Sequence, residues 1–325
     1  MNKNTKICTV GGGTAMPVVN RALIRAGFKK INSIVTTFDR GGDTGRIRTD
    51  ERGGVLAFSD YWRSLMSLWP DSEQKKIWEE MLKYRDGRSR NFGNIFFQFL
   101  SEKEGNLDNV DELFTKLTGA ELQGEVIPVS LESSDICLRT ITGKEYKGEN
   151  FVDDLKMSKD RIEEIWLDPM VKANPRAVDV IKKAEVIIVG PGTTFGSVLP
   201  NFLLEEIKNA YNKSKAKKIF MLNIFSPANE TESALLSNYV DTFRKYLGVQ
   251  SPFDLILMSD LSKLNSEVLK KVFYYYELEN AVLVKDDGLE KTRVLKVDVA
   301  VVESKNMRLR HDEKKLGKVF SELVI

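Results

Sequence analysis

One short segment of this chain gathers glycines, acids and arginines, the residue types that bind phosphates, sugars and metal ions. Asp39 and Asp43 lie within it, among a run of small and basic residues: Gly41, Gly42, Thr44, Gly45, Arg46 and Arg48. The glycines can turn backbone N–H groups toward an anion, and an arginine can hold a phosphate through a planar fork of donors. The two acids could hold a divalent metal or a sugar hydroxyl. The segment predicts a site for a phosphorylated ligand, and a solvated surface turn is the alternative.

The start of the chain contains a second candidate for phosphate binding. Residues 6–10 form a strand-like run, which is followed directly by Gly11, Gly12, Gly13 and Thr14. Pro17 then stands where a helix would begin. A strand, a glycine loop and a helix form the arrangement that places a phosphate on a helix N-terminus. The dinucleotide fingerprint is incomplete because Met16 occupies the place of its third glycine, so a turn without a ligand stays an alternative.

A third segment repeats this arrangement in the middle of the chain. Residues 186–189 are all aliphatic, which suits a strand buried on both faces of a parallel sheet. The turn after it carries small and hydroxyl residues that can face a phosphate: Gly190, Gly192, Thr193, Thr194 and Ser197. A helical stretch is expected over residues 198–211. Because both glycine turns follow buried strands, we expect them at one edge of the sheet, where open α/β sheets bind ligands.

Strand-like runs alternate with helical stretches along the chain, which is typical of parallel βαβ units. The strand-like runs are residues 6–10, 31–37, 125–130, 186–189, 219–223, 255–258 and 281–284. We therefore expect an α/β, Rossmann-like three-layer fold with a mostly parallel central sheet, in a single domain over residues 1–325. Residues 72–118 are predicted to form a helical insertion within it, and residues 123–149 a small β-rich addition.

Taken in order, these motifs resemble the signature of the CofD/YvcK family. The two glycine turns, Asp39 with the segment 41–48, and the run that ends at Asn94 all match it. Further matches follow along the chain, at residues 173–175, Asn223, residues 230–231 and residues 310–312. The resemblance therefore spans most of the chain, roughly residues 6–320. Each motif is weak alone, and their order and spacing make the resemblance specific.

The resemblance implies a function and a less favoured alternative. The segment 41–46 looks like the YvcK branch, which implies a protein that binds a nucleotide-sugar, a UDP-sugar above all. Such a protein would regulate carbon metabolism or cell-wall growth and cell shape. The alternative is a Mg²⁺-dependent, 2-phospho-L-lactate transferase-like enzyme that moves a phospholactyl or related group from a nucleoside-diphosphate-linked donor. In that case Asp39 and Asp43 would be catalytic and Asp39 would be the metal ligand, Mg²⁺ being the cofactor suggested.

The resemblance also assigns binding roles to particular residues. The nucleotide diphosphate would lie across residues 11–14 and 190–194, with Arg46 supplying positive charge. Two amides, Asn94 and Asn223, would hydrogen-bond the ligand. A tyrosine in this neighbourhood meets the nucleotide in the YvcK branch, and Tyr274 or Tyr275 is the candidate here, Tyr274 being the one chosen. Arg310 would meet a diphosphate or the uracil edge.

The chain departs from the family pattern at three places. Arg40 follows Asp39 where the family carries a second aspartate, which weakens a metal site built on two carboxylates. In residues 56–63 only Asp60 matches the family run, and its arginine is replaced by Trp62 unless the register moves to Arg63. Arg90 stands in the place of a histidine. The departures indicate a divergent subfamily with its own ligand preference.

The composition excludes several classes of partner and site. The 325 residues carry a formal net charge of +2 without a basic stripe, so nucleic acid is not an expected partner. No apolar stretch is long enough to cross a membrane and no signal peptide precedes the first strand, so we expect a cytoplasmic protein without a membrane partner. The single histidine, His311, argues against a Ser-His-Asp triad or a histidine-rich zinc site, and we expect it to cap or pack. The oligomeric state stays open, a homodimer included.

A Rossmann oxidoreductase is a further alternative. It would need a third glycine near Met16 and an acid after the second strand. Asp39 lies at about the spacing expected for that acid, so the spacing does not exclude this class.

Overall fold

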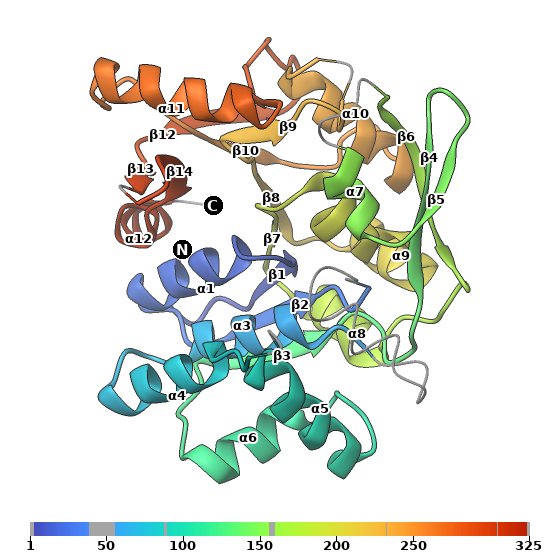
Figure 1. The fold of residues 1–325 in the computed structure, drawn as a ribbon, viewed down its shortest axis with the longest axis vertical. Helices are drawn as coiled ribbons and strands as arrows, with labels where there is room; N and C mark the ends of the chain where they lie inside the picture. Colours follow the sequence, from blue (N-terminus) through green and yellow to red (C-terminus); the bar gives the residue numbers. More distant parts are fainter. Residues whose placement is uncertain are drawn as a thin grey trace.

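The centre of the fold is a sheet of seven parallel strands (Figure 1). The computed structural model describes residues 3–38, 56–87, 90–155, 160–231, 233–303 and 305–323. In spatial order the strands are β12 (Arg293–Val297), β10 (Leu255–Ser259), β8 (Lys217–Met221), β7 (Val186–Val189), β1 (Ile7–Gly11), β2 (Ile31–Val35) and β3 (Gly124–Pro128). The expected α/β class and mostly parallel sheet are confirmed.

The order of the strands changes direction between β1 and β7. From β1 the chain proceeds outward through β2 to β3, and from β7 it proceeds outward the other way, through β8 and β10 to β12. Ile7 of β1 pairs with Ile31 on one side and with Val186 on the other. The turns that leave β1 and β7 therefore lie side by side. Open α/β sheets bind ligands at such a switch point, outside the carboxyl ends of the strands.

Helices cover both faces of the sheet. Side chains of a strand alternate between the two faces, so an apolar central strand leaves both faces to be buried. Ile187 and Val189 of β7 are buried in a core with α8 (Pro175–Lys183), α9 (Glu205–Lys213) and α10 (Leu236–Leu247). Ile188 is buried in the opposite core with α1 (Met16–Arg25) and α12 (Glu313–Glu322). The short aliphatic run thus sits in the middle of three layers, as expected of a central parallel strand.

The helical segment between β2 and β3 begins earlier than the sequence indicates. The predicted range 72–118 contains α4 (Glu73–Lys83), α5 (Phe92–Glu104) and α6 (Val110–Thr118), but α3 (Phe58–Leu68) precedes them. α3 packs on α1, β2 and β3, and its inner side is buried in the core that also contains Ile188, α1 and α12. Aromatic side chains join α5 to α6, where the rings of Phe97 and Phe114 are stacked 5.6 Å apart. This helical segment closes one end of the sheet (Figure 1).

Small antiparallel sheets lie beside the central one. β4 (Asp135–Thr140), β5 (Glu145–Lys147) and β6 (Ile162–Asp168) form one of them, and α7 (Asn150–Asp154) follows β5. The β-rich addition expected over residues 123–149 is therefore corrected at both ends, because β3 belongs to the main sheet and β6 lies beyond residue 149. β9 (Phe225–Pro227) pairs with β11 (Ala281–Leu283), and β13 (Ala300–Glu303) with β14 (Arg308–His311). Together with α11 (Ser266–Leu278), these two pairs enclose a third, smaller hydrophobic core.

Two strand assignments from the sequence are corrected. The run 281–284 was expected in the main sheet, but β11 pairs antiparallel with β9 outside it. The seventh strand of the main sheet is β12, which the sequence pattern did not indicate. β12 is an edge strand whose side chains are exposed or half-buried, so it lacks the apolar run that marks a central strand. Among the described residues, no helix combines the length and the apolar character that crossing a membrane requires.

Candidate functional site

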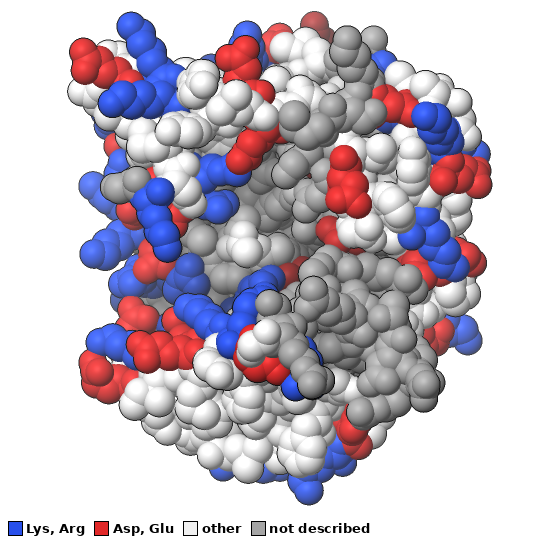
Figure 2. Space-filling view, viewed as in Figure 1, with Lys and Arg blue, Asp and Glu red and all other residues white. Residues whose placement is uncertain are grey.

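A cavity of about 800 Å³ lies over the carboxyl ends of β1 and β7. Figure 2 shows the hollow near the centre of this face, with Lys and Arg side chains along its border. The lining comes from the two glycine turns, the start of α3, and the wall formed by β9, α11 and β14. Arg85, the start of α5 (Phe92–Glu104) and Glu149 complete it. The polar and aromatic lining residues include Thr14, Asp60, Arg63, Arg85, Asn94, Glu149, Thr193, Ser197, Asn223, Phe225, Tyr276, Glu279, Arg308, Arg310 and His311.

The first glycine turn delivers the N-terminus of α1 to this cavity. Gly13 has a φ of +68°, a conformation that side-chain-bearing residues rarely adopt. Pro17 stands in the first turn of α1, as the sequence predicts, and no side chain caps the helix at Ala15. Thr14 and Ala15 both line the cavity. The start of α1 therefore has no side-chain cap and turns the positive end of its dipole toward the cavity, which favours an anion. Pro17 has no N–H, and the Val18 N–H already donates to the Ala15 carbonyl at 3.1 Å.

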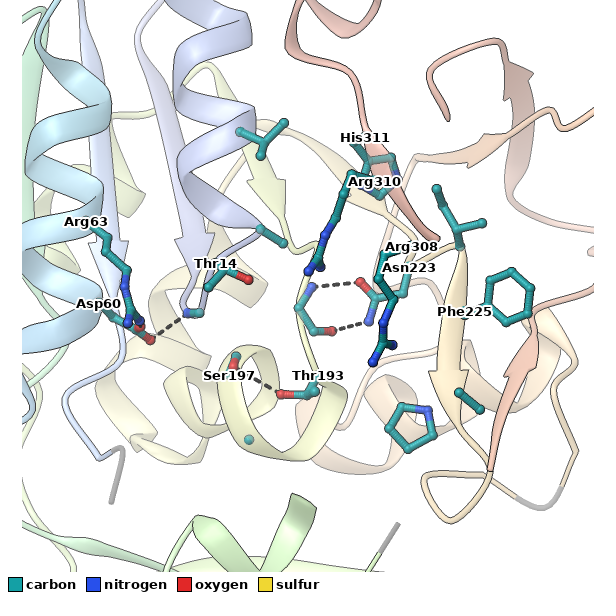
Figure 3. Close-up of a pocket in the computed structure, with 18 of the residues that line it drawn as sticks. Thr14, Asp60, Arg63, Thr193, Ser197, Asn223, Phe225, Arg308, Arg310 and His311 are labelled. Carbon is teal, nitrogen blue, oxygen red and sulfur yellow. Dashed lines mark hydrogen bonds and ion pairs between the residues drawn. The ribbon is translucent and has the colours of Figure 1, made fainter. Parts of the chain in front are cut away.

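Asp60 of α3 holds this first turn in place. Its Oδ2 accepts a hydrogen bond from the Gly13 N–H at 2.6 Å, and its Oδ1 lies 3.5 Å from the guanidinium of Arg63 (Figure 3). Asp60 is buried, whereas Arg63 is partly exposed to the cavity. A side chain at Gly12 would place its Cβ 2.6 Å from Asp60 Oδ2, so only glycine fits there. The carboxylate thus fixes the turn, and Arg63 carries the positive charge of this corner.

The second glycine turn is held by Asn223, which follows β8. The Gly192 N–H donates to Asn223 Oδ1 at 2.9 Å, and Asn223 Nδ2 donates to the Gly192 carbonyl at 2.6 Å. The hydroxyls of Thr193 and Ser197 lie 3.1 Å apart on the cavity wall (Figure 3). Gly190, at the start of the turn, has a φ of +73° and lies against the Met221 carbonyl. The turn therefore presents a rigid, hydroxyl-bearing edge to a ligand.

Thr194 is directed away from the cavity by a buried carboxylate. The Thr194 N–H donates to Glu230 Oε1 at 2.9 Å, and its hydroxyl donates to Glu230 Oε2 at 2.8 Å. Ser226 also donates its hydroxyl to Glu230, at 2.8 Å. The expected helix 198–211 is interrupted here, because a π-helical turn (Thr194–Val198) and a 3₁₀ turn (Leu199–Leu203) precede α9. Both Thr194 donors are thus taken by Glu230 in place of the predicted phosphate.

The third wall contributes arginines from β14. Residues two apart on a strand share a face, so Arg308 and Arg310 both reach the cavity, on either side of Leu309 (Figure 3). Arg308 pairs with Glu279, and its guanidinium lies 5.1 Å from the ring centre of Tyr276. The ion pair of Arg310 with Glu303 is long, at 3.7 Å, and its side chain is 55% exposed. Arg310 is therefore the less firmly paired cation of the two.

His311 is neutral at physiological pH. Loss of hydration and the neighbouring Arg310 cation lower the pKa of His311 to about 4, although a hydrogen bond to the Leu222 carbonyl opposes this shift. A neutral imidazole adds no positive charge to the cavity. The positive charge of this wall therefore comes from the arginines.

This shift predicts a pH-dependent contribution of His311 to stability. Between pH 6.5 and pH 4 the unfolded chain binds a proton that the folded His311 does not, so its contribution is present above pH 6.5 and is lost as the pH falls. We expect His311→Gln to retain about 1–2 kcal/mol more of its unfolding free energy than the wild type on going from pH 7 to pH 5. Urea unfolding of both proteins at the two pH values measures this difference. Equal losses in the two proteins would contradict the shift.

Two aromatic rings close one end of the cavity. Phe225 and Tyr276 are stacked with ring centres 3.8 Å apart and an interplanar angle of 4°. The Tyr276 hydroxyl donates to the Leu309 carbonyl and accepts from its N–H, which fixes the ring against β14. Tyr274, the tyrosine chosen from the sequence, is 58% exposed on α11 and is not among the lining residues. The structure places Tyr276 at the cavity instead.

The structure brings some of the residues predicted for the site together around the cavity. Seven of them line the cavity: Gly13, Thr14, Asn94, Gly192, Thr193, Asn223 and Arg310. Asn94 is partly engaged already, since its Oδ1 accepts from the Trp62 indole N–H at 2.9 Å. The glycines Gly11, Gly12 and Gly190 shape the turns from behind. Two further predicted residues, Thr194 and Tyr274, are described but do not line the cavity. The others lie outside the described part of the chain: Asp39, Gly41, Gly42, Asp43, Thr44, Gly45 and Arg46.

Several lining residues were not assigned to the site from the sequence. Asp60 and Arg63 were matched to the family run but were given no role, and Arg308 carried no local signal. Alternation along β14 would have placed Arg308 beside Arg310. Within the residues that the structure describes, no group of three or more His, Cys, Asp or Glu side chains could hold a metal ion. The predicted metal ligand, Asp39, lies outside them.

A comparison with known proteins identifies the family of this fold. A family profile described as 2-phospho-L-lactate transferase CofD matches residues 7–307. The chain belongs to the CofD family. The match spans both glycine turns and Asp60.

Relatives of this CofD-family chain are similar over its whole length. A Clostridium acetobutylicum protein, provisionally named a gluconeogenesis factor, is 31% identical over 330 residues, covering 99% of this chain and 70% of the relative. The Bacillus subtilis protein named gluconeogenesis factor is 26% identical over 333 residues, and the match covers 100% of this chain and 99% of that protein. A Bacillus halodurans crystal structure, described as a member of the UPF0052 family, superposes with a TM-score of 0.85 at 24% identity, covering 99% of this chain and 100% of that one. The CofD-family fold is thus shared.

Proposed function

We propose that this protein binds a nucleotide-sugar, a UDP-sugar such as UDP-N-acetylglucosamine, and that it regulates carbon metabolism or cell-wall growth in the cytoplasm. The observation that carries the proposal is the cavity at the switch point between β1 and β7, with a glycine turn from each strand and arginines on the facing wall. Its volume of about 800 Å³ suits a ligand of this size. The names of the gluconeogenesis factors support the regulatory part.

The diphosphate would lie between the glycine turns and β14. The start of α1 offers the positive end of its dipole and the hydroxyls of Thr193 and Ser197 offer donors on one side, and Arg310 offers a forked cation on the other. Asp60 is directed at the Gly13 N–H, which keeps its carboxylate bound to the protein backbone. Arg63 offsets its negative charge. These groups can bind two phosphates without a protein-bound metal.

The base would lie at the aromatic end. Phe225 and Tyr276 form a stacked pair at the cavity, and a nucleobase can pack against the side of this pair that lines the cavity. Arg308 already lies over the Tyr276 ring, so it is placed between the base and the phosphates. The sugar would then reach toward Asn94 at the start of α5.

Calorimetric titration with UDP-N-acetylglucosamine, in EDTA and in Mg²⁺, tests the proposal. We expect binding in both buffers, weaker binding of UDP because the sugar contacts are lost, and no detectable binding of free N-acetylglucosamine. A thermal shift provides the second readout, since ligand at about 100 times its dissociation constant adds roughly 2.7 kcal/mol. No binding of any UDP-sugar in either buffer would reject this function.

A second candidate is a Mg²⁺-dependent transferase, favoured by the description of the matching family profile. Asp39 and Asp43 are the proposed metal-binding residues, and in the described part of the chain Asp60 lies beside the glycine turn. Mg²⁺ would neutralise the diphosphate of a nucleoside-diphosphate-linked donor. Binding that requires Mg²⁺, followed by release of the nucleotide product, would favour the transferase over the regulator.

A further inference from the structure

The middle residue of β14 is held by a side chain of α11. In the described part of the chain β14 pairs with one strand, β13, so the backbone groups on its other edge need partners elsewhere. At Leu309 that partner is the Tyr276 hydroxyl, which accepts the Leu309 N–H at 3.2 Å and donates to the Leu309 carbonyl at 3.3 Å. Tyr276 is 7% exposed and Leu309 is 4% exposed, so these contacts are shielded from water. One hydroxyl therefore bonds both backbone groups of Leu309.

The ring of Tyr276 is itself fixed in position. It is stacked on Phe225 of β9, with the ring centres 3.8 Å apart and an interplanar angle of 4°. Val272, one turn earlier on α11, is fully buried in the same small core as Leu309. Because the stack and the buried face of the helix both hold the ring, its hydroxyl is a rigid support for β14.

Leu309 lies between the two arginines of the cavity wall. Arg308 and Arg310 share a face of β14, and Figure 3 shows both side chains extending from the strand into the cavity. A shift of the backbone at Leu309 would therefore move both. The ion pair of Arg310 with Glu303 is long, at 3.7 Å, and directs the side chain only weakly. The direction of Arg310 thus depends on how the backbone of β14 is held.

The Tyr276 hydroxyl has no proton left for a phosphate. A tyrosine hydroxyl carries one hydrogen, and Tyr276 donates it to the Leu309 carbonyl. The oxygens of an ionised phosphate are acceptors, so they cannot bond this hydroxyl as long as its contact with Leu309 is intact. Any effect of the hydroxyl on a bound phosphate therefore passes through β14.

We propose that Tyr276 is a positioning residue, whose hydroxyl holds β14 at Leu309 and thereby directs Arg308 and Arg310 toward the two phosphates of the ligand. Arginines that are held before the ligand arrives lose less conformational freedom on binding, which strengthens binding. The proposal rests on the proposed function because it takes a diphosphate as the ligand. It does not depend on which nucleotide or sugar carries that diphosphate.

The variant Tyr276→Phe removes the hydroxyl and keeps the ring that stacks on Phe225. The probes are inorganic pyrophosphate, which offers two phosphates without a base, and UDP, each titrated by calorimetry in EDTA. Binding to the variant must order two arginine side chains, at about two- to tenfold in affinity for each, so we expect both dissociation constants to rise about fivefold or more. Tyr84→Phe is the matched control. It removes a hydroxyl from a tyrosine that is 64% exposed and outside the lining, and it should bind both probes as the wild type does.

Two further measurements separate positioning from a loss of stability. In the Arg310→Gln protein one of the two directed side chains is already absent, so Tyr276→Phe should weaken UDP by a smaller factor there than in the wild type. Hydrogen exchange over residues 308–311 needs no ligand, and the Leu309 N–H should exchange faster in Tyr276→Phe than in Tyr84→Phe. Thermal midpoints above the assay temperature establish that each variant is folded.

The outcomes distinguish this proposal from the proposed function. If UDP-N-acetylglucosamine binds the wild type and Tyr276→Phe binds pyrophosphate and UDP unchanged, the positioning role is wrong and the function stands. An equal factor for UDP in the wild-type and Arg310→Gln backgrounds would also overturn the role of Tyr276, because its hydroxyl would not act through Arg310. If UDP-N-acetylglucosamine does not bind, but pyrophosphate does and is weakened by Tyr276→Phe, the function is rejected and the positioning role stands. A wild type that binds none of the three ligands would overturn both.

Discussion

Replacing Arg310 by glutamine is expected to weaken the binding of UDP-N-acetylglucosamine by about ten- to a hundredfold while leaving the fold intact. The guanidinium faces the first cavity beside the two glycine turns, where it can form charge-assisted hydrogen bonds to a phosphate. Losing such contacts costs about 1.5–3 kcal/mol. The fold should tolerate the change because the Arg310 side chain is 55% exposed and its ion pair with Glu303, at 3.7 Å, is long and screened by water.

Two further variants show whether the geometry of Arg310 or its charge matters. Arg310→Lys keeps the charge but loses the planar fork, so its affinity should fall between those of the wild type and Arg310→Gln. Arg293→Gln removes an exposed arginine from β12, far from the lining of the cavity, and should bind as the wild type does. Calorimetry gives the affinities and the thermal midpoint gives the stability. An unchanged affinity in Arg310→Gln would show that the diphosphate does not bind against β14.

Replacing Glu230 by alanine is expected to lower the unfolding free energy by about 2–4 kcal/mol. The carboxylate is 2% exposed and accepts from the Thr194 N–H, the Thr194 hydroxyl and the Ser226 hydroxyl. Without it, buried donors lose their partner, and each unsatisfied group costs roughly 1–3 kcal/mol. The turn after β7 would also lose its anchor, so we expect weaker binding of UDP-N-acetylglucosamine in the same variant.

Urea unfolding measures the loss, and a matched series identifies its cause. Glu230→Gln keeps the shape of the side chain but offers a single acceptor oxygen to three donors, so it should recover part of the stability. Glu121→Ala removes an exposed acid and should change the free energy by less than about 0.5 kcal/mol. If Glu230→Ala and Glu121→Ala were equally stable, the carboxylate would not be what holds the turn.

Local patterns in the sequence were sufficient to predict the two glycine turns. A short apolar strand, a glycine run and Pro17 in the first turn of a helix are signals carried by neighbouring residues, and the structure confirms β1 and α1 there. The aliphatic run 186–189 predicts a central strand because it must be buried on both faces, and β7 is one. Parallel strands bring their carboxyl ends to one edge, so the juxtaposition of the two turns also followed.

Contacts between distant residues could not be predicted in this way. Gly13 and Asp60 are separated by 47 positions, and only the packing of α3 on α1 brings the carboxylate to the Gly13 N–H. Thr194 is a residue type that commonly binds phosphate, yet its N–H and its hydroxyl both donate to the buried Glu230. In α11 the tyrosines are consecutive, and the third faces Phe225 because the helix is seated on β11 and β9.

The sequence by itself determined the class of the fold, the central strands and the edge of the sheet where the ligand site lies. These follow from hydrophobic burial and from the backbone freedom of glycine, which depend on residues close together in the chain. The tertiary structure decided which side chains face the cavity. Asp60, Arg63 and Tyr276 line it without having been predicted to, whereas the predicted Thr194 and Tyr274 do not line it. That choice depends on how helices pack on the sheet, and a linear pattern does not specify this packing.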